Sequence, residues 1–280
     1  MGQCPKCQIR AYLDGDNKME IIVCIKQVPA TTKVEVDEKT GVLMREGVET
    51  KMNPYDLYAI EASLKLKEEH GGSVTAITMG PAQAEEILRE SYMMGVDECA
   101  MLSDRAFAGS DVLATSYALA GVVKKLGAFD LIVCGKQTTD GDTAQVGTEL
   151  AEFLGIPHVS NVIRIIHKEN SAIRVEVDMA ESVQVQDIPL PCLITVEKDI
   201  YIPRLPSYKK KLESAKKEIQ IFKLQDLDDQ DSLHYGLDGS PTQVERVFPP
   251  QSSTEKIVVN GSGDEIADFL YQRLKELKFF

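Results

Sequence analysis

Short, almost wholly apolar runs alternate with amphipathic segments through the first half of the chain, and this alternation limits the fold more than any other feature. Strand-like runs lie at 20–28, 74–79, 98–102 and 131–134. Helical patterns separate or follow them at 56–69, 83–94, 111–126 and 144–154. Unbroken apolar strands joined through helices are typical of parallel sheets with right-handed crossovers. We therefore expect an α/β fold, a doubly wound and mainly parallel sheet.

The pattern changes after Pro157, and this change divides the chain. Three segments with alternating apolar and polar residues predict antiparallel or edge strands at 159–166, 172–178 and 182–187, before a strand at 193–196. A polar hairpin is expected within 33–45. From Ile202 the chain turns basic, then acidic and proline-rich to about 251, and ends in an amphipathic helix at 263–277. The expected division is a tail at 1–18, an α/β domain at 19–202 and an arm with a terminal helix at 203–280.

Composition argues against several functions. The formal charge is −13, with a pI near 4.9, so attraction to nucleic acid is not expected. No segment has the roughly 20 apolar residues needed to span a bilayer. Cys4 and Cys7 form a CxxC without a second ligand pair, so no metal site is predicted, and the tail lacks a signal-peptide pattern. The other cysteines stand singly in apolar or mixed runs, which favours reduced thiols and a cytoplasmic protein.

No arrangement of nucleophile, base and orienting group is apparent, and no catalytic residue is predicted. Ligands of open α/β sheets bind beyond the carboxyl ends of the strands. Loops at that edge are expected at 24–29, 53–56, 79–83 and 135–147. The last has Gly135, Gly141 and Gly147, with Thr143 and Gln145 where a helix begins, which suits a phosphate. Asp140 and Asp142 also fit an ordinary turn and helix cap.

A second junction of a loop and a helix occurs at 103–116. Asp111 or Ser110 can cap that helix, which is a purely structural role. Arg105 and Phe107 offer a positive charge and an aromatic ring beside the helix start. This pair would suit the phosphate and ring of a dinucleotide.

These motifs together resemble the beta subunit of electron-transfer flavoproteins over 19–277. The resemblance is carried by Ile22 to Pro29, Met52 to Asp56, Met79 to Gln83, Met93 to Asp97, Gly135 to Gly147 and the Pro203-Arg-Leu-Pro segment. It implies an adenine-nucleotide alpha-hydrolase-like fold. It also implies a heterodimer in which the arm and terminal helix pack on an FAD-carrying alpha subunit. Leu205 falls in what resembles the partner-recognition segment, although a packing role at a helix start is equally open.

The resemblance also implies a cofactor site. Cys24, Asn53, Asp56 and Met79 would surround an adenine and ribose, and the 135–147 loop would hold phosphates. Gly80 and the 104–109 loop would face NADH. The complete expected set is Cys24, Asn53, Asp56, Met79, Gly80, Asp104, Arg105, Phe107, Gly109, Thr138, Asp140, Gly141, Asp142, Thr143, Ala144, Gln145, Val146 and Gly147.

The family has two branches. In one, the beta subunit holds a structural AMP; in the other it holds a second FAD, oxidises NADH, and divides electrons between ferredoxin and a partner flavin dehydrogenase of the acyl-CoA dehydrogenase type. Small residues at Gly141 and Thr143 resemble the second, bifurcating branch, since they leave room for the larger pyrophosphate. An AMP-binding carrier is the alternative within the family. A universal-stress-type nucleotide-binding module is the alternative outside it, disfavoured by the long arm.

Overall fold

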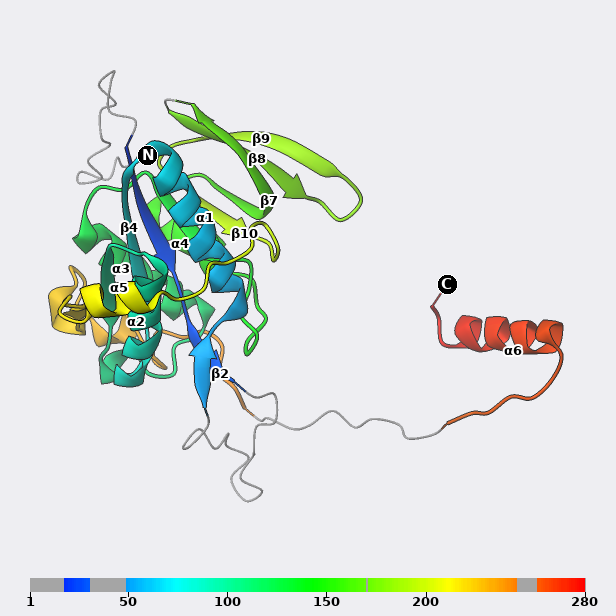
Figure 1. Cartoon of the computed structure of the whole chain (residues 1–280). Helices are drawn as coiled ribbons and strands as arrows, with labels where there is room; N and C mark the ends of the chain where they lie inside the picture. Colours follow the sequence, from blue (N-terminus) through cyan, green and yellow to red (C-terminus); the bar gives the residue numbers. More distant parts are fainter. Residues whose placement is uncertain (1–17, 31–48, 170, 246–255, 280) are drawn as a thin grey trace. The chain divides into compact units, whose positions relative to one another are not determined.

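The computed structural model describes residues 18–30, 49–169, 171–245 and 256–279. Nine of the described strands form one sheet in the order β11-β5-β4-β1-β6-β10-β7-β8-β9. Figure 1 labels β4, β10, β7, β8 and β9 of this sheet. Its parallel part consists of β1 (Met19–Cys24), β4 (Gly72–Met79), β5 (Glu98–Leu102), β6 (Leu131–Gly135), β10 (Cys192–Val196) and β11 (Gln220–Phe222), together with β7, which pairs parallel with β10. The expected doubly wound, mainly parallel α/β fold is confirmed.

Helices cover both faces of the parallel strands. α1 (Pro54–His70) and α2 (Glu85–Met94) pack on one face, over the side chains of Ile21, Val23 and Val133. α3 (Val112–Leu126) and α4 (Val146–Leu154) pack on the other, over Ile22 and Ile132. Alternate residues of one strand thus enter two different cores. This explains why the strands read as unbroken apolar runs rather than as alternating ones.

The first apolar run is divided in the structure. β1 ends at Cys24, and β2 (Gln27–Pro29) leaves the main sheet to pair antiparallel with β3 (Thr50–Met52). The break occurs where the amide of Lys26 donates to the Asp56 side chain instead of continuing the ladder. The predicted hairpin within 33–45 lies outside the described residues.

The predicted change of character after Pro157 is confirmed. β7 (His158–Glu169) lies parallel to β10, and β8 (Ala172–Asp178) and β9 (Val183–Pro189) continue the sheet antiparallel. Forked ion pairs cross this extension, Arg164 to Glu176 and Arg174 to Asp187.

Residues 203–245 pack on the α/β body. α5 (Tyr208–Ser214) lies against α2, and β11 adds to the edge of β5. Beyond β11 the chain forms two short 3₁₀ turns, Leu224–Asp226 and Ser232–His234, and buries Leu227 and Tyr235 against α3. Asp111, which caps α3, also accepts hydrogen bonds from the amide and hydroxyl of Thr242.

A second compact unit contains the described residues 256–279. Its helix α6 (Gly263–Glu276) begins with a capping box in which Ser262 and Glu265 exchange hydrogen bonds, at the predicted position. Throughout the described part of the chain, no helix is long and apolar enough to cross a membrane.

Candidate functional site

The strand order places the topological switch point of the sheet, where open α/β sheets have a ligand-binding crevice, between β1 and β6. The chain leaves β1 toward β4 and β5 on one side, and returns to β6 on the other side before continuing toward β10. Neighbouring connections therefore run to opposite sides of the sheet at this point. Ligands of open α/β sheets bind at such a switch point, beyond the carboxyl ends of the strands. Cys24 and Cys134 are register partners at these ends, and the hydrogen bond with the Cys24 thiol, together with burial, raises the pKa of Cys134.

A buried turn at the start of α1 forms one wall of the crevice. The Asn53 side chain donates to Asp56 Oδ1 and to the carbonyl of Gln137, both at 2.9 Å. Its own oxygen accepts the amide of Thr139 at 3.3 Å. Asn53 thereby joins the turn after β3 to the loop after β6, although 84 residues separate Asn53 from Gln137.

Asp56 is a buried carboxyl at the centre of this wall, with 4% of its surface exposed. It accepts from the Lys26 amide at 2.7 Å in addition to the Asn53 amide. Burial raises the pKa of Asp56 to about 7, against the opposing effect of these hydrogen bonds and of the Lys26 charge. A Cβ at Gly135 would lie 2.5 Å from Asp56 Oδ1, so glycine is required where β6 passes this wall.

The loop 136–145 forms a second wall, which the Asn53 hydrogen bonds join to the first. Asp142 and Ala144 have φ values of 54° and 55°, the left-handed region that is unfavourable for residues other than glycine. Side-chain hydrogen bonds hold this conformation: Gln137 donates to Asp142, and Thr138 Oγ1 accepts the Gly141 amide at 3.4 Å. Backbone strain of this kind is concentrated at ligand-binding loops.

Lys26 joins the two walls and was missed by the sequence reasoning. Its ammonium group donates to both carboxylate oxygens of Asp140, at 2.8 and 2.7 Å. Burial opposes ionisation of Asp140, but the Lys26 contact outweighs it and lowers the pKa of that carboxyl. An ionised carboxylate cannot donate a hydrogen bond to a phosphate. Asp140 therefore orients Lys26, and any direct contact with an anion falls to Lys26 and to backbone amides.

The start of α4 supplies such amides. The side chain of Gln145, its N-cap residue, makes no capping hydrogen bond to the described residues of the helix. The first amides of a helix lack partners within it and carry partial positive charge. Gly147 in this first turn is buried, and a Cβ there would lie 2.8 Å from Thr195 Cγ2 on β10. The helix start thus approaches the strand ends closely, an arrangement that fits the phosphate of a nucleotide cofactor.

Comparison with known proteins identifies the family. A family model described as the electron transfer flavoprotein domain matches residues 40–227. The chain belongs to the electron-transfer flavoprotein family. It is 45% identical to Protein FixA of Azorhizobium caulinodans, over 85% of this chain and 87% of that one. It is 40% identical to an electron transfer flavoprotein subunit beta of Clostridium acetobutylicum and 42% identical to the caffeyl-CoA reductase-Etf complex subunit CarD of Acetobacterium woodii; each match covers 92% of this chain and 98% of the relative.

This membership supports an electron-transfer role in complex with an alpha subunit, and family members generally bind flavin and AMP. In this flavoprotein subunit, the structure brings together most of the residues that the sequence singled out. Those at the two walls of the crevice or at the start of α4 are Cys24, Asn53, Asp56, Thr138, Asp140, Gly141, Asp142, Thr143, Ala144, Gln145, Val146 and Gly147. Met79 ends the neighbouring strand β4 and Gly80 follows it; the Gly80 amide donates to the carbonyl of Leu102 at 3.0 Å.

The 104–109 loop contacts the segment after β11 rather than the two walls of the crevice. Asp104 accepts amides from Ala106 and Leu224, at 3.2 and 3.3 Å, so its carboxylate ties the loop to the segment after β11. Phe107 is only 5% exposed and packs edge-on against Tyr235, with ring centroids 5.5 Å apart. Packing against Tyr235 therefore accounts for this aromatic ring, which is too buried to stack on the ring of a dinucleotide. Arg105 and Gly109 remain exposed beside it.

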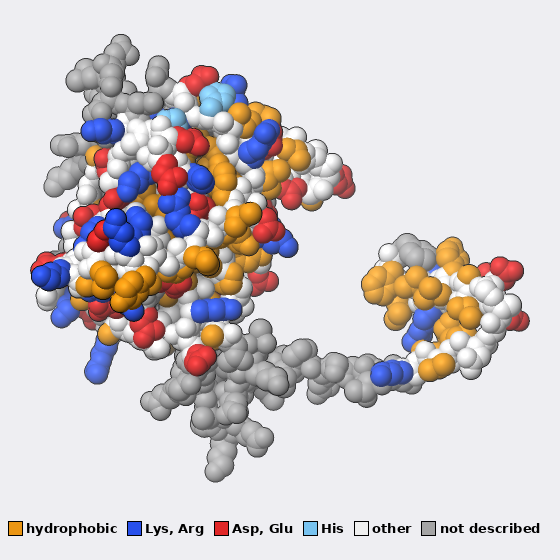
Figure 2. Space-filling model, viewed as in Figure 1, with side chains coloured by type: hydrophobic (Ala, Val, Ile, Leu, Met, Phe, Trp, Pro, Cys, Tyr) orange, Lys and Arg blue, Asp and Glu red, His pale blue; other side chains and the backbone are white. Residues whose placement is uncertain are grey.

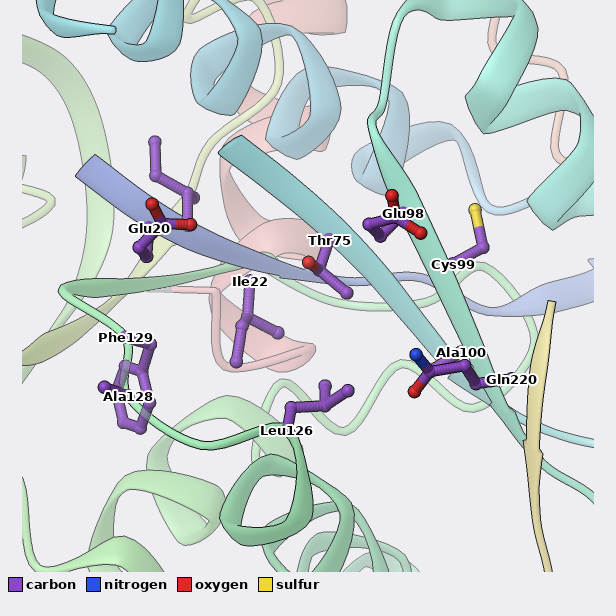
Figure 3. A pocket seen from close by; sticks show the side chains of 11 residues that line it. Glu20, Ile22, Thr75, Glu98, Cys99, Ala100, Leu126, Ala128, Phe129 and Gln220 are labelled. Atoms are coloured by element: carbon purple, nitrogen blue, oxygen red, sulfur yellow. The ribbon is translucent and has the colours of Figure 1, made fainter. Parts of the chain in front are cut away.

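A hollow lies at the other edge of the sheet, near the amino ends of β1, β4 and β5 (Figure 3). Apolar side chains of Ile22, Leu126 and Phe129 line it together with the polar groups of Glu20 and Glu98. Because the strained loop and the start of α4 lie at the carboxyl edge, we do not assign the cofactor to this hollow.

Proposed function

We propose that the chain is the beta subunit of a bifurcating electron-transfer flavoprotein, which holds an FAD at the β1–β6 crevice and oxidises NADH there. The observation that carries this proposal is the open start of α4 beside a strained loop with Gly141 at its tip. Among the described residues, a Cβ at Gly141 would meet only Thr138 Oγ1, at 3.5 Å. The backbone therefore does not itself demand glycine, and the missing side chain is explained as space for a pyrophosphate.

When bound, the flavin supplies the redox chemistry, and the chain supplies binding and orientation. The amides at the start of α4 bind the phosphates, and Lys26 adds a positive charge held in place by Asp140. Asn53 and Asp56 fix the wall that faces the adenine and ribose. Met79, Gly80 and the exposed Arg105 and Gly109 of the 104–109 loop face NADH, while the Asp104 carboxylate holds this loop to the Leu224 amide.

The partners in this proposal are an FAD-carrying alpha subunit, a flavin dehydrogenase of the acyl-CoA dehydrogenase type, and ferredoxin, all in the cytoplasm. Residues 203–280 make the contacts with other proteins, with Leu205 directed at the dehydrogenase. The name of the CarD relative, which places it in a complex with a caffeyl-CoA reductase, supports a reductase or dehydrogenase as partner.

Anaerobic titration of the purified heterodimer with NADH tests the proposal. Bleaching of flavin absorbance by stoichiometric NADH is expected, because the proposed site accepts electrons from NADH directly. A heterodimer that is reduced by dithionite but not by NADH would contradict it.

The second candidate is an electron carrier whose beta subunit holds AMP. It is favoured by the 104–109 loop, since Asp104 and Phe107 are engaged with the segment 222–242 rather than turned toward the crevice. AMP would need only the crevice itself. The universal-stress-type alternative is not retained, because the chain belongs to the flavoprotein family.

A further inference from the structure

An exposed leucine stands between two fixed points in the segment before α5. Leu205 is 87% exposed and Pro206 is also exposed. The preceding residue, Arg204, is bound to α1, and the following one, Ser207, donates its amide to the carbonyl of Met93 at the end of α2, at 2.9 Å. Because Arg204 and Ser207 are both held, the short stretch of Leu205 and Pro206 between them cannot fold back to bury the leucine side chain.

Arg204 is held by an unusually complete set of hydrogen bonds. Its backbone amide and Nε both donate to Glu61 Oε2, at 3.0 and 2.8 Å, and a terminal nitrogen donates to Glu61 Oε1 at 2.9 Å. The other terminal nitrogen donates to Glu68 at 2.7 Å. The Glu61 side chain is 3% exposed, and the Arg204 contacts outweigh its burial and lower its pKa. This arrangement fixes the backbone as well as the side chain of Arg204.

Stability alone is a poor explanation for this arrangement. A buried ion pair gains little over well-packed apolar residues, because both charges lose their hydration. What a forked arginine does provide is a single geometry, since its planar donors match both carboxylate oxygens at once. Here that geometry serves to keep an apolar side chain in water, which is otherwise unfavourable.

The surface around Leu205 has the chemistry of a docking site. Ile202, Tyr208 and Leu212 are 93, 72 and 64% exposed. Exposed lysines at 209–211 flank them, although the whole chain carries a charge of −13. Figure 2 shows hydrophobic side chains with lysine or arginine side chains nearby at the place where Figure 1 labels α5. An apolar anchor within a positive rim fits a protein with an apolar pocket bordered by carboxylates.

We propose that Arg204 and Glu61 are positioning residues, which hold Leu205 in the conformation that enters a pocket on the flavin dehydrogenase. The inference rests on the partner-recognition role of Leu205 proposed above. Arg204 acts through Leu205 and does not itself touch the partner. Replacing Arg204 alone, or Leu205 alone, should therefore impair recognition of the dehydrogenase as much as replacing both.

A double-mutant cycle in the purified heterodimer tests this coupling. The variants are Leu205→Ala, Arg204→Met, both together, and Arg204→Lys, which keeps the charge but loses the fork. Arg164→Met is the matched control, because Arg164 makes a similar fork with Glu176 on β7 and β8. The acceptor is a purified acyl-CoA dehydrogenase from the same cells that accepts electrons from the unmodified heterodimer. Reduction of a small dye and the flavin content are measured alongside.

Leu205→Ala and Arg204→Met are each expected to lower kcat/KM for the dehydrogenase about tenfold, through KM, and the double variant no further. Arg204→Lys should fall between these variants and the unmodified protein, and it carries the test if the methionine variant does not assemble. Dye reduction and flavin content should not change in any variant. Arg164→Met should match the unmodified protein.

Four results would overturn the inference. Multiplied losses in the double variant would show that Arg204 acts independently of Leu205. If Arg204→Met lost dye reduction and flavin content to the same extent as kcat/KM for the dehydrogenase, the role of Arg204 would be merely structural. Normal kinetics for Arg204→Met beside impaired Leu205→Ala would refute the positioning role alone, whereas normal kinetics for Leu205→Ala would also remove the proposed recognition by Leu205.

Discussion

Replacing Asp56 with asparagine should change the pH dependence of stability in a direction that the structure fixes. Asp56 has an ordinary pKa of 3.8, and burial raises it to about 7 in the folded chain. Between these values the folded chain binds more protons than the unfolded one, so stability falls as the pH rises through this window. At pH above 7 the full cost is about 4 kcal/mol, from (7 − 3.8) × 1.36 kcal/mol.

The substitution removes this titration but introduces a mismatch. Both amide hydrogens of Asn53 are already used, on Asp56 and Gln137, and its oxygen accepts Thr139, so its side chain cannot turn over without losing bonds. The NH2 group of an asparagine at position 56 would therefore face another donor, either the Asn53 side-chain amide or the Lys26 backbone amide. That conflict costs about 1–3 kcal/mol at every pH.

The difference in stability between the two proteins isolates Asp56, because other titrating groups cancel. From about pH 5.5 to about pH 8.5 it should move by about 2 kcal/mol in favour of the variant. Thermal unfolding of the heterodimer, followed by circular dichroism, should show this as a relative gain of about 4 °C. A difference that stays constant across this range would show that Asp56 remains ionised, and would refute the assignment of its raised pKa to burial.

Three further predictions concern the crevice and the segment after β11. Gly141→Leu should weaken FAD retention more than AMP retention in equilibrium binding to the heterodimer, and equal losses would argue against the FAD assignment. Gly147→Ala should lower stability by about 1–3 kcal/mol, since its Cβ would lie 2.8 Å from Thr195 Cγ2. Adding Thr195→Ser, which removes that carbon, should restore most of the loss in urea unfolding; no recovery would point to another cause. The contact with Asp229 raises the pKa of His234, so its contribution is complete below the ordinary value of 6.5 and is lost as the pH rises through the raised value. Proteolysis of the segment 224–245 should accelerate over that rise, and His234→Gln should abolish the dependence; a persisting dependence would exclude His234 as its source.

Local patterns were enough to predict the layers of the fold. The strands of the parallel sheet are buried on both faces, so each is a continuous apolar run in the sequence. The helices end at glycines such as Gly127 and Gly155, which mark their ends in the sequence. Apolar and polar residues alternate in β8 and β9 because successive side chains of a strand point to opposite faces of the sheet. The exact end of β1 was not predictable, because it depends on Asp56, which lies 30 residues from Lys26.

The candidate site was predicted as a set of loops but not as a set of interactions. The pairing of Lys26 with Asp140 spans 114 residues and leaves no local pattern, although a lysine directly after an apolar strand was a usable signal. Phe107, by contrast, was assigned to the site from the sequence but is buried by packing in the structure. Its packing partner Tyr235 lies far along the chain, so an aromatic ring beside a helix start gave no indication that it was buried.

The nucleotide content of the heterodimer tests the central claim most directly. Nucleotides released by denaturation of the chain copurified with its alpha subunit can be separated and counted by chromatography. Two FAD per heterodimer and no AMP is the predicted result. One FAD with one AMP would contradict it and would remove the proposed NADH site as well.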